Sequence, residues 1–235
     1  MDSLVAEEQS KVLGLRFIIL TVVGFLLVGV IIFLPAGSLD WKEGWLYFAL
    51  MASSWGLMTV LMIRKNPSLL KRRMSIGEGT KRWDRVLLGL FRLFSLAIFV
   101  VAGMDAVRYG WSSMSSAFWG LGLILHILGW GIATWSMLEN PHFEGTVRIQ
   151  CDQDHRVVDQ GPYAIVRHPG YVGFALIFGA IPFLLGSWSA FAPTGLLIIT
   201  MLVRTQLEDR TLRAELEGYE DYARRVKYRL LPGIW

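Results

Sequence analysis

The sequence QCDQDHRVVDQGPYAIVRHPGY, residues 150–171, interrupts a largely apolar chain and decides how its hydrophobic runs are arranged. It contains two of the four histidines and several charged side chains. Gly161-Pro162 and His168-Pro169-Gly170 predict two tight turns within it, and such turns expose backbone N–H groups and fix the side chains beside them. We call this segment the polar loop and expect the chemistry of the protein to reside there.

The composition identifies the environment of the chain. Of its 235 residues, 54% are hydrophobic and 18% are charged, and the mean hydropathy is +0.46. This excludes an ordinary soluble domain and favours a protein whose helices cross a membrane. The net charge of +4 arises from basic residues beside apolar runs. Such residues mark topology and contact lipid headgroups, so we expect membrane lipids as partners and no nucleic acid.

The apolar runs predict an all-α membrane protein with about six transmembrane segments. Four spans precede the polar loop and a helical hairpin follows it, with approximate limits of 15–34, 41–63, 86–107 and 117–138 for the spans and 172–185 and 190–203 for the hairpin. We divide the chain into an N-terminal four-span region, 1–138, and a C-terminal region, 139–235. The second region also includes an amphipathic helix at about 204–227.

The distribution of charge predicts the orientation of the protein. The linker 64–85, between the second and third spans, is strongly basic and should therefore face the cytoplasm. Six crossings then place the N-terminus, the polar loop and the C-terminus in the cytoplasm. The sequence leaves open which membrane holds the protein, its oligomeric state and any contact of the linker with a substrate.

Several residues within the spans have no role that the sequence assigns. Four glycines of the fourth span would allow close helix approach: Gly120, Gly122, Gly129 and Gly131. His126 is either a hydrogen-bonded packing residue or a buried ligand, and Asp105 lies close enough to a span end to reach the interface. The four histidines show no metal-ligand spacing and the single cysteine, Cys151, is isolated, so we expect no metal.

Arg204 and Glu208 stand four residues apart at the point where the hairpin gives way to a charged tail. This spacing puts both side chains on one face of a helix. A guanidinium at the bilayer centre costs about 2.5–3.5 kcal/mol, so an arginine next to lipid needs a partner or a function. The two residues are therefore candidates for a site that the polar loop also lines.

The ordered motifs of the C-terminal region resemble those of a known family. His155-Arg-Val-Val158, Gly161-Pro-Tyr163 and Arg167-His-Pro-Gly-Tyr171 are followed, after the hairpin, by Arg204-x-x-x-Glu208-Asp209 and a tail with several tyrosines. Over about residues 140–235 this combination resembles the isoprenylcysteine carboxyl methyltransferases and their phospholipid methyltransferase relatives. The resemblance implies an integral membrane methyltransferase whose cofactor, S-adenosylmethionine, is enclosed by the polar loop, the hairpin and the C-terminal helix.

The same resemblance implies a set of site residues. Catalytic roles fall on Arg204, on the substrate side, and on Arg167. The implied cofactor-binding residues are Gln150, His155, Arg156, Val157, Val158, Gly161, Tyr163, His168, Pro169, Gly170, Tyr171 and Glu208. Asp209 departs from the pattern, because relatives usually carry a second glutamate there, and its shorter side chain leaves its role open.

The sequence leaves the acceptor and two other functions open. A lipophilic or lipid-anchored carboxylate would arrive ionised and need only Arg204 to orient it, whereas an amine or hydroxyl would need a base such as His168 or Glu208. The ending from Tyr222 to Pro232 also resembles the tail of sterol reductases, which use a reduced nicotinamide cofactor. A non-catalytic membrane protein is the third alternative.

Overall fold

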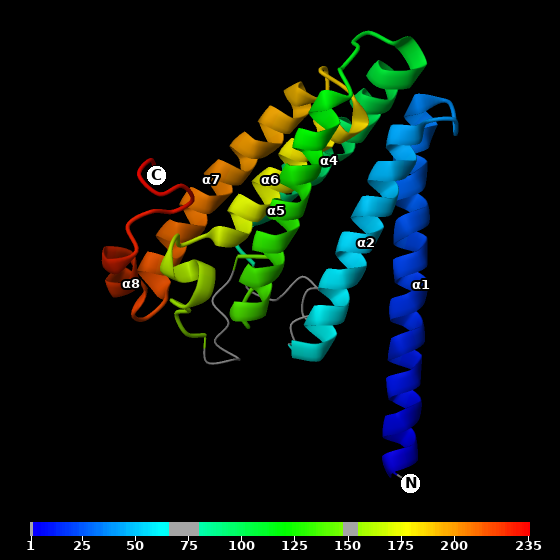
Figure 1. Cartoon of the computed structure of the whole chain (residues 1–235). Helices are drawn as coiled ribbons and strands as arrows, with labels where there is room; N and C mark the ends of the chain where they lie inside the picture. Colours follow the sequence, from blue (N-terminus) through cyan, green and yellow to red (C-terminus); the bar gives the residue numbers. More distant parts are fainter. Residues whose placement is uncertain (1, 66–79, 148–154) are drawn as a thin grey trace.

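The computed structural model describes residues 2–65, 80–147 and 155–235, and within these ranges the chain is helical with no strand. The elements, shown in Figure 1, are α1 (Asp2–Ala36), α2 (Lys42–Lys65), α4 (Arg82–Gly103), the π-helical turn η1 (Met104–Tyr109), α5 (Ala117–Glu139), the 3₁₀ turn η3 (Gly161–Ala164), α6 (Pro169–Leu185), α7 (Phe191–Glu215) and α8 (Tyr219–Arg225). The predicted all-helical class is confirmed.

The N-terminal region contains helices of membrane-spanning length. Among the described residues, four segments are long and apolar enough to cross a bilayer, namely Ile19–Ala36 of α1, α2, α4 together with η1, and α5. The apolar helix α6 is shorter, with 17 residues and a length of about 25 Å. It forms a hairpin with α7 by turning at Gly186, which has a φ of 71°. The predicted hairpin is therefore present, and the count of six crossings stays a prediction.

The second arm of the hairpin and the first part of the charged tail are one helix. α7 runs unbroken for 25 residues and includes both Arg204 and Glu208. The prediction of a separate amphipathic helix over 204–227 is wrong in its limits, because the break comes after Glu215, and α8 begins behind Gly218, whose φ is 78°. Charged residues such as Arg and Glu are good helix formers, so the change in composition at 204 does not interrupt the backbone.

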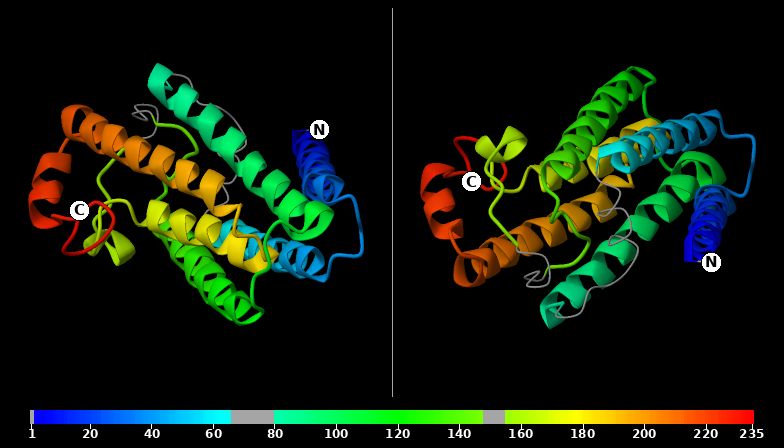
Figure 2. Two further views of the ribbon diagram at one scale, coloured as in Figure 1. Left: turned by 90° about the horizontal axis from the view of Figure 1, so that it is seen from above. Right: turned by 90° about the horizontal axis from the view of Figure 1, so that it is seen from below.

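The helix α6 lies between α5 and α7 (Figure 2). Gly129 of α5 and Gly173 of α6 permit this approach, since a Cβ added to either would lie 2.7 or 2.8 Å from backbone atoms of the other helix. Gly122 also faces α6. Gly120 and Gly131, which we expected to act alike, would have no atom within 4 Å of an added Cβ. Gly122 and Gly129 are seven positions apart and therefore share the helix face that contacts α6, whereas Gly120 and Gly131 lie on other faces of the helix.

Two polar residues of the spans are buried by pairing. Asp105 of η1 has no exposed surface, and its Oδ2 accepts hydrogen bonds from the hydroxyls of Ser112 and Ser187, each at 2.6 Å. It thus fastens η1 to the hairpin turn, a structural role that the sequence left unassigned. His126 is buried with Nε2 3.1 Å from the Ser54 hydroxyl, which agrees with a packing role.

Replacing Gly129 with alanine should destabilise the protein, whereas replacing Gly131 should not. A Cβ at position 129 must displace α6, and overpacking of this kind costs about 1–3 kcal/mol. The space at position 131 is open, and alanine is favoured over glycine in a helix by about 1 kcal/mol. Thermal unfolding in detergent measures both variants. Equal melting temperatures for the two would contradict this account of the α5–α6 contact.

Candidate functional site

The described part of the polar loop, residues 155–171, and the helices around it enclose a cavity of about 380 Å³. This volume lies in the range of small-molecule sites. The wall is formed by residues 140–147 after α5, by the polar loop, and by α6, α7 and α8. Leu88 and Phe91 of α4, with Phe174 and Phe178 of α6, add an apolar portion. The cavity therefore combines polar side chains from the loops and from α7 with an apolar portion from α4 and α6.

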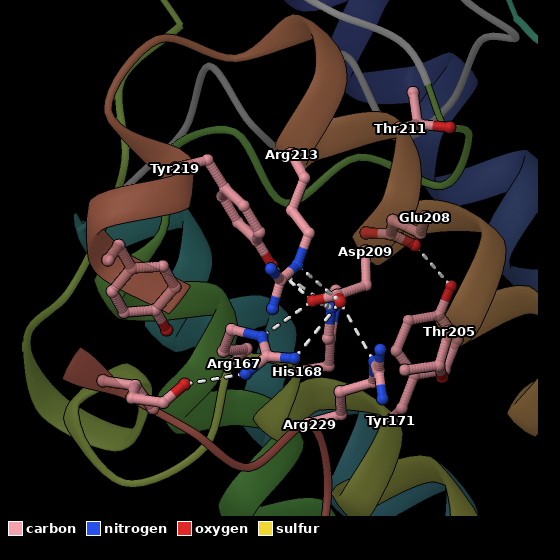
Figure 3. Close-up of polar contacts among 12 residues, drawn as sticks. Arg167, His168, Tyr171, Thr205, Glu208, Asp209, Thr211, Arg213, Tyr219 and Arg229 are labelled. Carbon is pink, nitrogen blue, oxygen red and sulfur yellow. Dashed lines mark hydrogen bonds and ion pairs between the residues drawn. The ribbon is translucent and has the colours of Figure 1, made fainter. Parts of the chain in front are cut away.

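One buried carboxylate joins the segments around the cavity (Figure 3). Asp209 of α7 has no exposed surface. Its Oδ1 accepts hydrogen bonds from Arg167 Nε at 2.7 Å and the Tyr219 hydroxyl at 3.1 Å, and lies 3.2 Å from His168 Nε2. Its Oδ2 accepts a hydrogen bond from Arg229 Nε at 3.0 Å. The carboxylate thus connects α7 to the polar loop, to α8 and to the C-terminal segment.

Electrostatics keep this carboxylate ionised. Burial alone would raise the pKa of Asp209, but hydrogen bonds from His168 and Arg167 outweigh burial and hold the pKa well below its usual range. The phenol of Tyr219 is affected in the opposite direction, because burial and the nearby Asp209 charge raise its pKa far above the ordinary value. At neutral pH Asp209 is therefore an acceptor and Tyr219 a donor.

Arg167 is engaged on nearly all sides. Its side chain is 1% exposed. Besides the two bonds to Asp209, its Nη1 donates to the carbonyls of Val226 at 2.7 Å and Lys227 at 2.8 Å. These contacts use four of the five N–H groups of a guanidinium. Arg167 therefore braces the site, and the catalytic role implied by the resemblance stays a prediction.

A second polar group occupies another face of α7. The Tyr171 hydroxyl donates to Glu208 Oε2 at 2.6 Å, and the guanidinium carbon of Arg204 lies 5.6 Å from the centre of the Tyr171 ring. All three residues line the cavity. Arg204 Nε also donates to Oδ1 of Asp84 at 2.7 Å, a partner that the sequence analysis did not identify.

Ten of the fourteen predicted site residues line the cavity: His155, Arg156, Val157, Val158, Tyr163, Arg167, His168, Tyr171, Arg204 and Glu208. Gly161 begins η3 with a φ of 56°, and Pro169 and Gly170 form the first turn of α6. These three residues therefore set the backbone next to lining residues and do not line the cavity themselves. Gln150 lies outside the described residues. Within the described ranges, no group of three His, Cys, Asp or Glu side chains could hold a metal ion.

Several residues of the site are not predicted by the sequence motifs. Asp84 lies in the stretch interpreted as a basic linker, which contains one other acid, Glu78, and nothing in the local sequence distinguishes Asp84 as a residue of the site. Asn140 lines the cavity and donates to the Tyr163 hydroxyl at 3.3 Å, and the Tyr222 hydroxyl donates to the Tyr163 carbonyl at 2.8 Å. No local pattern predicts these contacts, since the partners are distant in the sequence.

Comparison with known proteins confirms the family resemblance. The model of the isoprenylcysteine carboxyl methyltransferase (ICMT) family matches residues 122–214. The matched part extends from α5 through most of α7 and includes the polar loop. The structure of the eukaryotic intramembrane Ras methyltransferase ICMT superposes with a TM-score of 0.53 at 20% identity, covering 80% of this chain and 65% of that one. The two proteins share a fold.

Two curated relatives are bacterial. The chain is 29% identical over 169 residues to a methanethiol S-methyltransferase of Pseudomonas sp. (strain GM41), covering 63% of this chain and 64% of the relative. It is 31% identical over 137 residues to a methanethiol S-methyltransferase of Pseudomonas deceptionensis, covering 54% and 48%. The chain thus spans less than two thirds of the length of each relative.

Asp209→Asn should destabilise the protein by about 3–5 kcal/mol, because it leaves buried cations without their partner. The loss should depend on pH. The folded pKa lies below the unfolded value of about 3.9, so the stabilisation is complete above about pH 5 and disappears as the pH falls through the folded pKa. Denaturant titration of both proteins should therefore give a difference in unfolding free energy that is constant above about pH 5 and shrinks in acid.

Glu220→Gln is the matched control for this prediction. Arg213 pairs with Asp209 at 3.3 Å and with Glu220 at 2.9 Å, but the Glu220 side chain is 48% exposed. Exposed pairs contribute about 0–1 kcal/mol. The assignment of Asp209 would be refuted by a Glu220→Gln variant of equal instability, or by an Asp209→Asn difference that grows toward acid.

Proposed function

We propose that the chain is an integral membrane methyltransferase that uses S-adenosylmethionine and acts on a lipophilic acceptor. The observation that carries this proposal is the cavity, whose wall collects ten of the fourteen residues that the motifs predicted for such a site. The match to the ICMT family and the names of the two Pseudomonas relatives support methyl transfer.

The residues of the wall suit this cofactor. S-adenosylmethionine has a sulfonium cation, an ammonium group and an aromatic base. Glu208 and Glu144 place negative charge in the wall, which attracts its cationic groups, and the wall also contains the aromatic side chains Tyr163, Tyr171 and Phe143, a residue type that binds cations and bases. When bound, the cofactor supplies a methyl group activated by a positive sulfur, which is left as a neutral thioether. The chain has to align the acceptor with that methyl group and exclude water.

The apolar portion of the wall supports a lipophilic acceptor. Leu88, Phe91, Phe174 and Phe178 belong to α4 and α6, and α4 with η1 is long and apolar enough to span a bilayer. We propose that the acceptor enters from the membrane along these helices. The orientation predicted from the basic linker places the polar part of the cavity in the cytoplasm, where the cofactor is available.

Two acceptor groups are consistent with the polar residues of the wall. A carboxylate, which the motif resemblance implies, would use Arg204 as an orienting cation. A thiol is the acceptor named in the two Pseudomonas relatives, and it must lose a proton. Oε1 of Glu208 accepts no hydrogen bond from any described residue and can take up that proton.

The reductase alternative rests on the C-terminal tail, and the contacts of the tail offer another explanation for its residues. The Tyr222 hydroxyl donates to the Tyr163 carbonyl, and the carbonyls of Tyr228 and Arg229 accept the backbone N–H groups of Arg167 and His168, both at 2.9 Å. The tail therefore braces the polar loop. This role requires no nicotinamide cofactor.

Calorimetry on the detergent-purified chain tests the cofactor. We expect S-adenosylmethionine to bind in the micromolar range and reduced nicotinamide dinucleotide phosphate not to bind. Glu208→Gln should weaken S-adenosylmethionine binding at least about tenfold, equivalent to about 1.4 kcal/mol, because it removes a negative charge that attracts the cationic groups of the cofactor. Its matched control is Glu217→Gln, an exposed glutamate beyond the end of α7 that is outside the cavity wall. Binding of the nicotinamide cofactor alone would refute the proposal and favour the reductase.

A further inference from the structure

The guanidinium of Arg204 is already paired within the protein. Its Nε donates to Asp84 Oδ1 at 2.7 Å, and its Nη2 donates to the carbonyl of Gly145 at 2.9 Å. Asp84 lies in the first turn of α4 and has no exposed surface, and its Oδ2 accepts the backbone N–H of Val147 at 2.8 Å. The pair therefore joins α4, the segment 140–147 and α7 beside the cavity.

This pairing changes what Arg204 can offer to an acceptor. The Asp84 carboxylate balances the charge of Arg204, whose side chain is only 15% exposed. An acceptor carboxylate would either displace Asp84, leaving that acid buried and unpaired, or lie next to it as a like charge. Both arrangements are strongly unfavourable in a buried site. An uncharged acceptor meets neither penalty.

Hydrogen-bonding capacity remains for an uncharged acceptor. Nη1 of Arg204 has no hydrogen-bond partner among the described residues, so it can donate to a neutral atom. Glu208 stands four residues further along α7 and keeps Oε1 as an acceptor. One donor and one proton acceptor are therefore present on the cavity face of α7.

We propose that Asp84 is a specificity-determining residue, which neutralises Arg204 and so selects acceptors that arrive without a negative charge, thiols in particular. The inference rests on the proposed methyltransferase function. A thiol acceptor exchanges its S–H bond for an S–C bond to the transferred methyl group, and the proton goes to the Glu208 carboxylate. The methyl group leaves the cofactor sulfur, which keeps the electron pair of the broken S–C bond and becomes a neutral thioether, so charge and atoms balance.

A purely structural role for Asp84 is the alternative, since the pair also holds α4 against α7. The Lys81–Glu215 ion pair offers a comparison, because it joins the residue before α4 to the last residue of α7 at 2.7 Å without touching Arg204. Both of its side chains are substantially exposed, and neither lines the cavity. Glu215→Gln therefore removes a tie between the same helices and leaves the charge at Arg204 unchanged.

The test compares two acceptors with the same alkyl chain. Decanethiol is uncharged and decanoate is ionised at neutral pH, and their methylated products are separable. We expect the wild-type chain to prefer decanethiol. Asp84→Asn should raise the ratio of kcat/KM for decanoate to that for decanethiol about tenfold or more, equivalent to about 1.4 kcal/mol. Asp84→Glu should restore the wild-type ratio, and Glu215→Gln should leave it unchanged.

Equilibrium binding gives a second measurement that does not depend on turnover. Decanoate should bind weakly to the wild-type chain and more tightly to Asp84→Asn, whereas decanethiol should bind both alike. If Asp84→Asn does not fold, inhibition of the wild-type chain decides, because decanoate should then be a poor competitor of decanethiol. Strong competition by decanoate would overturn the proposal.

The possible failures are distinguishable. An Asp84→Asn variant that loses activity toward both acceptors in parallel, with an unchanged ratio, shows a structural role and overturns the specificity proposal alone. A wild-type chain that prefers decanoate has the same consequence. A wild-type chain that binds no S-adenosylmethionine and methylates neither compound refutes the proposed function, and the inference that rests on it falls as well.

Discussion

The Asp209 carboxylate is the constraint on which the site depends. An ionised group without exposed surface is tolerated only when its acceptor positions are filled. The donors that fill them come from the polar loop, from α8 and from the C-terminal segment, so one side chain of α7 fixes three segments at once. Tyr163, Tyr219 and Tyr222 pack into a small apolar cluster beside it. The cavity has its shape because these segments converge on a single charge.

The register of α7 gives neighbouring acids different environments. Successive residues on an α-helix point about 100° apart, so Glu208 lines the cavity while Asp209 faces the polar loop and the tail. The family resemblance implies a glutamate at the second position, so the sequence leaves the role of the aspartate open. In this fold the short side chain keeps the carboxylate close to the α7 backbone, within reach of Arg167, Arg213 and Arg229. Its role is to brace the site.

Local patterns predicted much of this structure. Hydrophobic run lengths gave the four long helices and the hairpin, and the ordered motifs gave ten residues of the wall. The sequence did not predict that α7 continues beyond residue 204. Charged residues indicate that a helix has left the apolar environment, but they do not indicate where the helix ends. The pair of Arg204 with Asp84 spans 120 positions, and nothing in either local sequence marks the other as a partner. Pairings of this kind exist only after the helices have packed.

The two buried acids, Asp209 and Asp84, differ in how many hydrogen-bonding groups around them remain available to a ligand. Asp209 accepts hydrogen bonds from Arg167, Tyr219 and Arg229, and Arg167 is also bonded to two backbone carbonyls, so that cluster offers little to a ligand. Asp84 pairs with Arg204 through Nε and leaves Nη1 of Arg204 without a hydrogen-bond partner among the described residues. Oε1 of Glu208 likewise accepts no hydrogen bond from a described residue. The polar capacity left on α7 is thus one neutralised cationic donor and one acceptor. Such a pair is suited to hold an uncharged nucleophile and remove its proton, and poorly suited to bind an anion.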